Sequence, residues 1–260
     1  MLHHLRIVRL FWGTAIAAEM EYRVNFVIAA LTASMQMVLN IFGLWLFYRT
    51  GYQPGGWTWH EALLVQGVFT LLEGVSQTWL SPNIGRIVTQ VQTGTLDFVL
   101  LKPIDSQFWV STRNMSPWGL PDLLLGAATI LYAAIALGLP WHRVLLGIVP
   151  IALSIAILFG LWFILACTAV WFVKIYNITE VLRSFLEAGK FPVQAYPPAY
   201  RFVFTFILPV AFLTTVPAQT MLDRSTPGWI LGAALVAVAL LAFGRWFWRF
   251  AMRYYTSASS

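Results

Sequence analysis

Residues 144–173 read VLLGIVPIALSIAILFGLWFILACTAVWFV, and no charged side chain interrupts them. A helix crosses a lipid bilayer with about 20 predominantly apolar residues. This stretch exceeds that requirement, so it predicts a membrane-spanning helix. Other stretches meet the same requirement, at residues 24–48, 61–80, 120–139 and 229–250.

The composition agrees with a membrane protein. Hydrophobic residues make up 59% of the 260 residues and charged residues 10%, whereas soluble domains carry about 25% charged residues. The net charge of +6 would favour a nucleic-acid partner in a soluble chain. Here the basic residues flank apolar segments, a pattern typical of topology signals and of contact with lipid headgroups. We predict one all-α integral membrane domain over residues 1–260, with membrane lipid and no nucleic acid as a partner.

Residues 174–222 are compatible with two routes of the chain through the membrane. In one, residues 201–221 cross as the fifth helix, although Pro209 and Pro217 interrupt its backbone hydrogen bonds. In the other, residues 177–193 cross with their charged side chains turned toward protein or water, and an apolar re-entrant region follows over residues 194–222. Both paths give six transmembrane helices and put the two termini on the same side.

The basic residues indicate which side that is. If both termini are cytoplasmic, eleven of the 16 lysine and arginine residues lie inside and Arg49, Arg143 and Arg224 lie outside, while Lys190 and Arg201 depend on the path. Cytoplasmic loops are enriched in lysine and arginine. We therefore predict an N-in, C-in topology.

Residues 1–23 are amphipathic on a helical wheel. Arg6 and Arg9 fall on the side opposite Phe11 and Trp12, which is typical of a helix lying in the membrane interface. An Ala-x-Ala motif in the same segment also resembles the cleavage site of a signal peptide. We favour the interfacial helix.

The longest predicted cytoplasmic loop, residues 81–117, contains TGTLDFVLLKPI at residues 93–104. Gly94 can end one helix in the left-handed conformation, Thr95 can cap the next helix, and Pro103 stops it. The short helix would put Leu96, Val99 and Leu100 on one face and leave Asp97 and Lys102 for polar contacts. It either packs on its own bundle or lipid, or docks a cytoplasmic partner.

Polar side chains recur at helical spacing in two predicted spans. Asn25, Thr32, Gln36 and Asn40 share one face of the first span, and Gln66, Thr70, Glu73 and Gln77 share one face of the second. The two faces could line a substrate path, or their groups could bond across helices at about 0.6–2 kcal/mol each. Glu73 is costly in a bilayer unless it is paired or hydrated. It is therefore a candidate for the path or for a buried ion pair.

A second charged set follows the fourth predicted span. Glu180, Arg183 and Glu187 have the spacing to pair with one another on one helix. The single cysteine, Cys167, lies in an apolar run, where a buried structural thiol is expected.

Catalytic and metal-binding motifs are missing from the sequence. There is no phosphate-binding G-x-x-x-x-G-K-[ST] motif, no G-x-S-x-G elbow and no metal-binding histidine pattern. We expect no enzyme activity, no metal site and no cofactor in this chain.

Three stretches resemble one branch of the ABC-2 type permeases, the transmembrane subunits of ATP-binding-cassette exporters. They are GTLDFVLLKPIDSQFW at residues 94–109, YPPAYRFVFTFILPVAFLTTVPA at residues 196–218 and RWFWRFAMRYYTSASS at residues 245–260. The resemblance implies a six-helix fold in the inner membrane of a prokaryote, a coupling helix at about Gly94 to Pro103 that docks on the ATPase, and a re-entrant hairpin at about Tyr196 to Pro217 near the outer face. It also implies a partner ATPase that holds ATP and Mg²⁺, and a second permease, either a copy of this chain or a related paralogue.

The leading prediction is thus an exporter permease. Its predicted ATPase-coupling residues are Thr95, Leu96, Asp97, Val99, Leu100 and Lys102, and its predicted path residues are Asn25, Gln36, Asn40, Gln66, Thr70, Glu73 and Gln77. An alternative is an ion-coupled secondary transporter or channel that uses Glu73. An intramembrane enzyme acting on lipids is disfavoured by the missing catalytic motifs.

Overall fold

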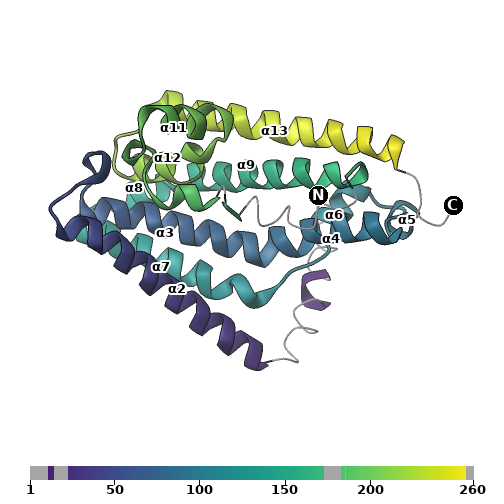
Figure 1. The fold of residues 1–260 in the computed structure, drawn as a ribbon, viewed down its shortest axis with the longest axis horizontal. Coiled ribbons are helices and arrows are strands. Elements are labelled where there is room, and N and C mark those ends of the chain that lie inside the picture. Colours follow the sequence, from purple (N-terminus) through teal and green to yellow (C-terminus); the bar gives the residue numbers. More distant parts are fainter. Residues whose placement is uncertain (1–10, 15–22, 173–182, 185, 256–260) are drawn as a thin grey trace.

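The computed structural model describes residues 11–14, 23–172, 183–184 and 186–255, and these residues form helices and connecting turns without a strand (Figure 1). The α-helices are α2 (Arg23–Arg49), α3 (Trp59–Val75), α4 (Ser81–Thr93), α5 (Asp97–Leu100), α6 (Ser106–Thr112), α7 (Leu120–Ala136), α8 (Trp141–Leu146), α9 (Ile148–Cys167), α11 (Pro198–Phe202), α12 (Val216–Met221) and α13 (Pro227–Tyr254). Short 3₁₀ turns are η1 (Pro54–Gly56), η3 (Pro117–Gly119), η4 (Thr168–Val170), η5 (Ala188–Lys190) and η6 (Val193–Ala195). Three π-helical turns are η2 (Ser76–Leu80), η7 (Val203–Ile207) and η8 (Ala211–Thr215).

Four helices of the described chain are long and apolar enough to cross a membrane. They cover Val24–Arg49, Pro117–Ala136, Trp141–Val170 and Pro227–Tyr254, which confirms four of the predicted spans within a few residues. A bent pair, Pro198–Ile207 and Ala211–Met221, would make a fifth span if its two halves crossed together. The prediction of six spans stays a prediction. Residues 177–182 and 185 of the alternative fifth helix at 177–193 lie outside the described residues, and its described part runs into the 3₁₀ turn η5.

The predicted span at 61–80 is helical but is too polar to count among these four. The helical backbone runs without a break from α3 through the π-helical turn η2 into α4. Glu61, Gln66 and Thr70 on α3 are buried against other parts of the chain. A helix that contacts protein on most of its surface does not need an apolar surface toward lipid.

Glycines let α3 and α7 pack closely. A Cβ atom on Gly67 would lie 2.9 Å from the backbone nitrogen of Ile130, and one on Gly74 would lie 2.5 Å from the backbone nitrogen of Leu123. Gly126 of α7 meets Leu71 of α3 equally closely. Small residues at such crossings bring two backbones together in a membrane, where helix association depends on packing.

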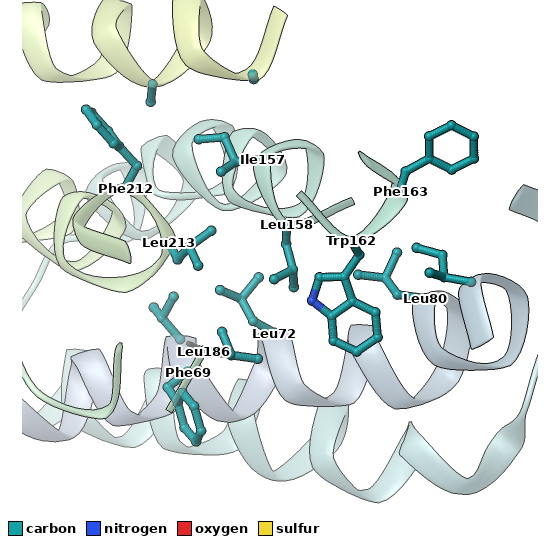
Figure 2. Packing of buried hydrophobic residues seen from close by; sticks show 14 of the residues in the cluster. Phe69, Leu72, Leu80, Ile157, Leu158, Trp162, Phe163, Leu186, Phe212 and Leu213 are labelled. Carbon is teal, nitrogen blue, oxygen red and sulfur yellow. The ribbon is translucent and has the colours of Figure 1, made fainter. Parts of the chain in front are cut away.

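The main apolar core lies between α3, α9, α13 and the segment that precedes α13. Figure 2 shows Leu72 of α3 facing Leu158 of α9, with Leu186 and Leu213 beside them. All four side chains are buried. The core thus joins chain segments far apart in sequence.

The bent pair enters and leaves at the same end of α3. At the entry, Gln194 lies so close to Gly55, just before α3, that a Cβ on Gly55 would be 2.7 Å from the Gln194 carbonyl carbon. At the exit, Arg224 bonds Glu61 in the first turn of α3 at 2.6 Å. The two halves meet at 80°. This geometry disfavours a straight crossing by residues 201–221.

Polar side chains satisfy the backbone of this bent segment. The Ser154 hydroxyl donates to the Phe212 carbonyl at 2.8 Å, and the Thr214 hydroxyl donates to the Gly189 carbonyl at 2.8 Å. The Thr215 hydroxyl accepts from the Val193 amide at 3.0 Å. These contacts replace helical hydrogen bonds that the bend and its prolines remove.

Both described ends of the chain lie at the same end of the bundle, on the right in Figure 1. The helical turn at 11–14 contacts α6, through a hydrogen bond from the Trp12 indole to the Thr112 carbonyl at 3.2 Å. The C-terminal end of α13 lies beside the same helix, because the Trp248 indole donates to Ser106 at 3.1 Å. The rest of the predicted interfacial helix over residues 1–23 lies mostly outside the described residues.

Candidate functional site

A polar cleft of about 320 Å³ opens in the bundle where α3 meets η2 and α4. Its lining includes Glu73, Gln77, Arg183 and Trp162. The Glu73 carboxylate lies 3.2 Å from the Arg183 guanidinium and accepts a hydrogen bond from the Gln77 amide at 3.2 Å. Glu73 is 12% exposed and Arg183 is 47% exposed, so the pair is buried on one side and open on the other.

A further carboxylate lies near this pair. Asp122, in the first turn of α7, packs against Gly74 and interacts electrostatically with both Glu73 and Arg183. Arg183 therefore faces two acidic groups. The ion pairs of the described residues join Arg183 to Glu73 and Glu187 to Lys190 at 3.6 Å, and they do not join Arg183 to Glu187. The predicted pairing of Arg183 with Glu180 stays a prediction. Glu180 lies outside the described residues.

The π-helical turn η2 contributes to the cleft. Ser76 and Gln77, which line it, both belong to η2. Turns of this kind widen the backbone ladder and are frequent at functional sites. Trp162 adds an indole NH that is buried and has no hydrogen-bond acceptor within the described part of the chain. The cleft can thus offer a cation, a carboxylate and hydrogen-bond donors to a bound group.

The remaining predicted path residues are divided between the interior and the surface. Gln66 and Thr70 are buried and bond each other, with the Gln66 amide 3.3 Å from the Thr70 hydroxyl. Asn25 and Gln36 are exposed on α2, and the Gln36 amide donates to the half-buried Asn40 at 3.2 Å. Within the described chain, no hydrogen bond joins this α2 set to the α3 set. The path role of all seven residues stays a prediction.

The predicted coupling segment, Gly94 to Pro103, directly follows α4 and contains α5. Gly94 ends α4 in the left-handed conformation, with φ of 70°, which confirms the predicted helix end. The predicted cap at Thr95 is wrong, because α5 begins after Leu96 and has no side-chain cap. The Thr95 hydroxyl instead lies 2.9 Å from that of Thr93. The tight turn leaves Leu96, rather than Thr95, at the start of the helix.

The predicted apolar face of α5 is divided between the interior and the surface. Leu96 and Val99 are buried in the core, whereas Leu100 is exposed together with Phe98 and Leu101. The exposed fractions are 69% for Phe98 and 81% for Leu101. We refer to Phe98, Leu100 and Leu101 as the apolar tip. The predicted face of Leu96, Val99 and Leu100 is therefore not uniform, because Leu96 and Val99 anchor the turn and Leu100 is exposed.

Polar contacts hold this tip to the rest of the bundle. The Asp105 side chain caps α6 by accepting from the Phe108 amide at 2.9 Å and bonds Arg245 of α13 at 2.6 Å. The hydrogen bonds from Arg245 hold the pKa of Asp105 below its usual value. Burial and the nearby carboxylate of Asp97 raise the pKa of Tyr255, just after α13. The Lys102 ammonium lies over the Trp109 ring at 4.4 Å. These contacts connect the segment around the tip to α13.

Sequence reasoning missed the ion pair between Glu61 and Arg224. The Glu61 side chain is 7% exposed, bonds Arg224 through both carboxylate oxygens at 2.6 and 3.0 Å, and caps α3 by accepting from the Thr58 amide at 2.9 Å. The only signal in the sequence was the capping pattern of Thr58 and Glu61. The partner 163 residues away has no local signature.

The comparisons with known proteins point to one family. A family model described as ABC-2 family transporter protein matches residues 34–259, which include every helix from the middle of α2 onward. No curated protein and no solved structure matches the sequence. The match spans most of the chain and agrees with its apolar helices, so this multi-pass membrane protein belongs to the ABC-2 transporter family.

Proposed function

We propose that this chain is the permease subunit of an ATP-driven exporter, with six transmembrane helices and both termini on the cytoplasmic side of a prokaryotic inner membrane. The observation that carries the proposal is the family match over residues 34–259, because permeases of this family work with an ATPase subunit. ATP and Mg²⁺ would be bound by that partner, since the sequence has no phosphate-binding loop.

The apolar tip is the proposed contact with the ATPase. Phe98 and Leu101 present large apolar side chains to solvent at the end of the bundle that also carries Arg86, Lys102 and Arg113. Exposed apolar clusters rimmed by polar residues are typical of protein interaction sites. Asp105 and Arg245 connect this region to α13, which gives a route from the docked ATPase to the transmembrane helices.

The exposed polar face of α2 is the proposed contact with a second permease, either a copy of this chain or a paralogue. α2 diverges from the other long helices in Figure 1, and Asn25, Thr32 and Gln36 on it are exposed. Amide groups facing hydrocarbon are costly unless they find partners. A second permease would supply those partners and enclose the substrate path, with the Glu73 cleft on the inner side.

The bent segment between Gln194 and Arg224 is the proposed re-entrant hairpin at the outer face. Its entry and exit at the first turn of α3 support this, as does the ion pair between Arg143 and Asp223 at 2.8 Å. Arg49, Arg143 and Arg224 would then lie on the outer side, as the charge distribution predicts.

Affinity purification from native membranes in mild detergent tests the proposal. Phe98→Asp with Leu101→Asp changes the tip at exposed positions and leaves the buried Leu96 intact. Tyr52→Asp with Gln53→Asp adds the same charge to the exposed loop before α3 and is the matched control. We expect a nucleotide-binding ATPase to purify with the wild type and the control and to be lost from the tip variant.

The contrary result is also informative. If no ATPase accompanies any of the three proteins, the exporter proposal fails at its energy source. The ion-coupled transporter or channel that uses Glu73 then becomes the leading candidate, because the cleft gives solvent access to this carboxylate.

A further inference from the structure

A second polar cavity, of about 220 Å³, lies between α4 and α6 at the end of the bundle that contains the apolar tip. Its lining includes Asn83, Arg86, Gln90, Trp109, Arg113 and Asn114. Among the described residues, two guanidinium groups and no carboxylate border this space. The cavity is separate from the Glu73 cleft and from the exposed face of the apolar tip.

Two basic groups at this cavity, Arg113 and Lys102, lie over aromatic rings. The Arg113 guanidinium lies 4.7 Å from the Phe11 ring and 5.7 Å from the Trp109 ring. Lys102 covers the same Trp109 ring. The ion pairs found among the described residues include neither Arg86, Lys102 nor Arg113. An aromatic ring attracts a cation only weakly. A basic group over a ring can therefore still bind an anion.

The floor of the cavity is held by a hydrogen-bond network. The Asn83 amide donates to the carbonyls of Trp79 and Asn114 at 2.7 Å each, and its oxygen accepts from the Asn114 backbone amide at 2.8 Å. Asn83 is 1% exposed. The network fixes α4 against the chain after α6, so Arg86 and Arg113 are presented from a rigid frame. Preorganised groups bind a ligand at a lower entropic cost.

The surroundings of the cavity are those of a membrane interface. Phe11 packs edge-on against Trp109, and the Trp12 indole donates to Thr112 on the same helix. Tryptophan and basic side chains gather at the headgroup level of membranes, and basic pockets at the ends of transmembrane helices bind phosphate-bearing headgroups. Arginine is suited to phosphate because its planar fork donates two parallel hydrogen bonds.

We propose that Arg86 and Arg113 form a binding site for the phosphate group of an anionic phospholipid in the leaflet next to the apolar tip. The lipid would connect α4 and α6, the two helices that flank the tip. The site does not depend on the proposed ATPase coupling, because lipid binding can be measured on the permease alone. A soluble phosphate compound offers the same chemistry, and the experiment separates the two sources.

The test uses the purified full-length protein in neutral detergent and titrates it with short-chain phosphatidylglycerol, followed by native mass spectrometry. Parallel titrations use short-chain phosphatidylcholine and inorganic phosphate. Arg86→Gln and Arg113→Gln are compared with Arg253→Gln, which removes the same charge from an exposed position near the end of α13. Arg113→Lys keeps the charge of Arg113 and removes its planar guanidinium group.

We expect each glutamine variant to weaken phosphatidylglycerol binding about tenfold, since a charge-assisted hydrogen bond is lost. Arg253→Gln should bind phosphatidylglycerol as the wild type does. The affinity of Arg113→Lys should lie between that of the wild type and that of Arg113→Gln. Because Arg86 is exposed and has no structural partner among the described residues, its variant should keep the unfolding temperature of the wild type, which separates loss of binding from loss of fold.

Three outcomes would overturn the proposal. If wild type and Arg86→Gln bind phosphatidylglycerol equally well, Arg86 is not part of a phospholipid site and the proposal is wrong. Binding of inorganic phosphate as tightly as the lipid would assign the site to a soluble phosphate compound. Loss of a co-purifying ATPase from Arg86→Gln, with lipid binding unchanged, would make the cavity a protein contact.

Discussion

Glu73 is the residue whose charge is most closely tied to the proposed path. Glu73→Gln removes the carboxylate that lies 3.2 Å from the Arg183 guanidinium and keeps the shape of the side chain. Because Arg183 is 47% exposed, water replaces part of the lost interaction and the folding cost stays below about 1 kcal/mol. We expect altered ATP hydrolysis by the purified assembly with unchanged abundance in the membrane.

Glu187→Gln is the matched control for this change. It removes the carboxylate that faces Lys190, and Glu187 is itself about half exposed. We expect this variant to hydrolyse ATP as the wild type does. Loss of folded Glu73→Gln protein, with normal activity in the fraction that remains, would show that Glu73 has a structural role only.

Asp105 makes the contact between α6 and α13 sensitive to acid. Arg245 lowers the pKa of Asp105 in the folded protein, so the pair stabilises the fold fully above the unfolded pKa of about 3.9. This contribution is lost as the pH falls through the lower folded value. The difference in unfolding temperature between wild type and Asp105→Asn should therefore be constant near neutral pH and shrink below about pH 4.

The contact is partly exposed, so the difference itself should be small, at most about 1 kcal/mol. A difference between the two proteins that grew as the pH fell would contradict the sign of this coupling. Thermal unfolding of both proteins across a pH series in the same detergent measures it.

At the scale of elements, the crossing of α3 and α7 depends on the missing side chains of its glycines. Gly74→Ala places a methyl group 2.5 Å from the Leu123 backbone nitrogen, so the helices must separate. We expect a loss of about 1–3 kcal/mol, as for other overpacked sites. Gly43→Ala on α2 meets nothing within 4 Å, and because alanine favours a helix over glycine, it should not lower the unfolding temperature. Equal effects of the two changes would contradict the close crossing.

The bent segment before α13 depends on buried hydroxyl groups. Thr214→Val keeps the shape of the side chain and leaves the Gly189 carbonyl without its donor. Leaving a buried acceptor unpaired costs about 1–3 kcal/mol. Thr32→Val removes a hydroxyl that bonds only within its own exposed helix, so its effect should be smaller. Thermal unfolding of the two variants compares them directly, and a larger effect of Thr32→Val would refute the anchoring role of Thr214.

At the scale of the whole molecule, the sequence predicts the long apolar helices well. Residues 24–48 and 144–173 exceed the membrane thickness without internal charges, so length and composition were enough to find them. The helix end at Gly94 was also readable, because only glycine adopts its conformation at no cost.

Contacts between distant segments could not be read from the sequence. Helical periodicity gives the face of a residue and not the neighbour it meets, so Glu61 had no visible link to Arg224 and Glu73 had none to Arg183. Leu96 and Leu100 look equivalent by spacing, yet one is buried and the other exposed. Which of them faces the bundle depends on how the turn at Gly94 packs, a property of the tertiary structure.

The most direct test of the proposed function is site-specific photocrosslinking in native membranes. A benzophenone amino acid at position 98 occupies the apolar tip, and one at position 52 occupies an exposed site in the loop before α3. We predict a covalent adduct with a nucleotide-binding ATPase from position 98 and none from position 52. An intact membrane-inserted protein that gives no ATPase adduct at position 98, or equal adducts at both positions, would contradict the proposed coupling surface.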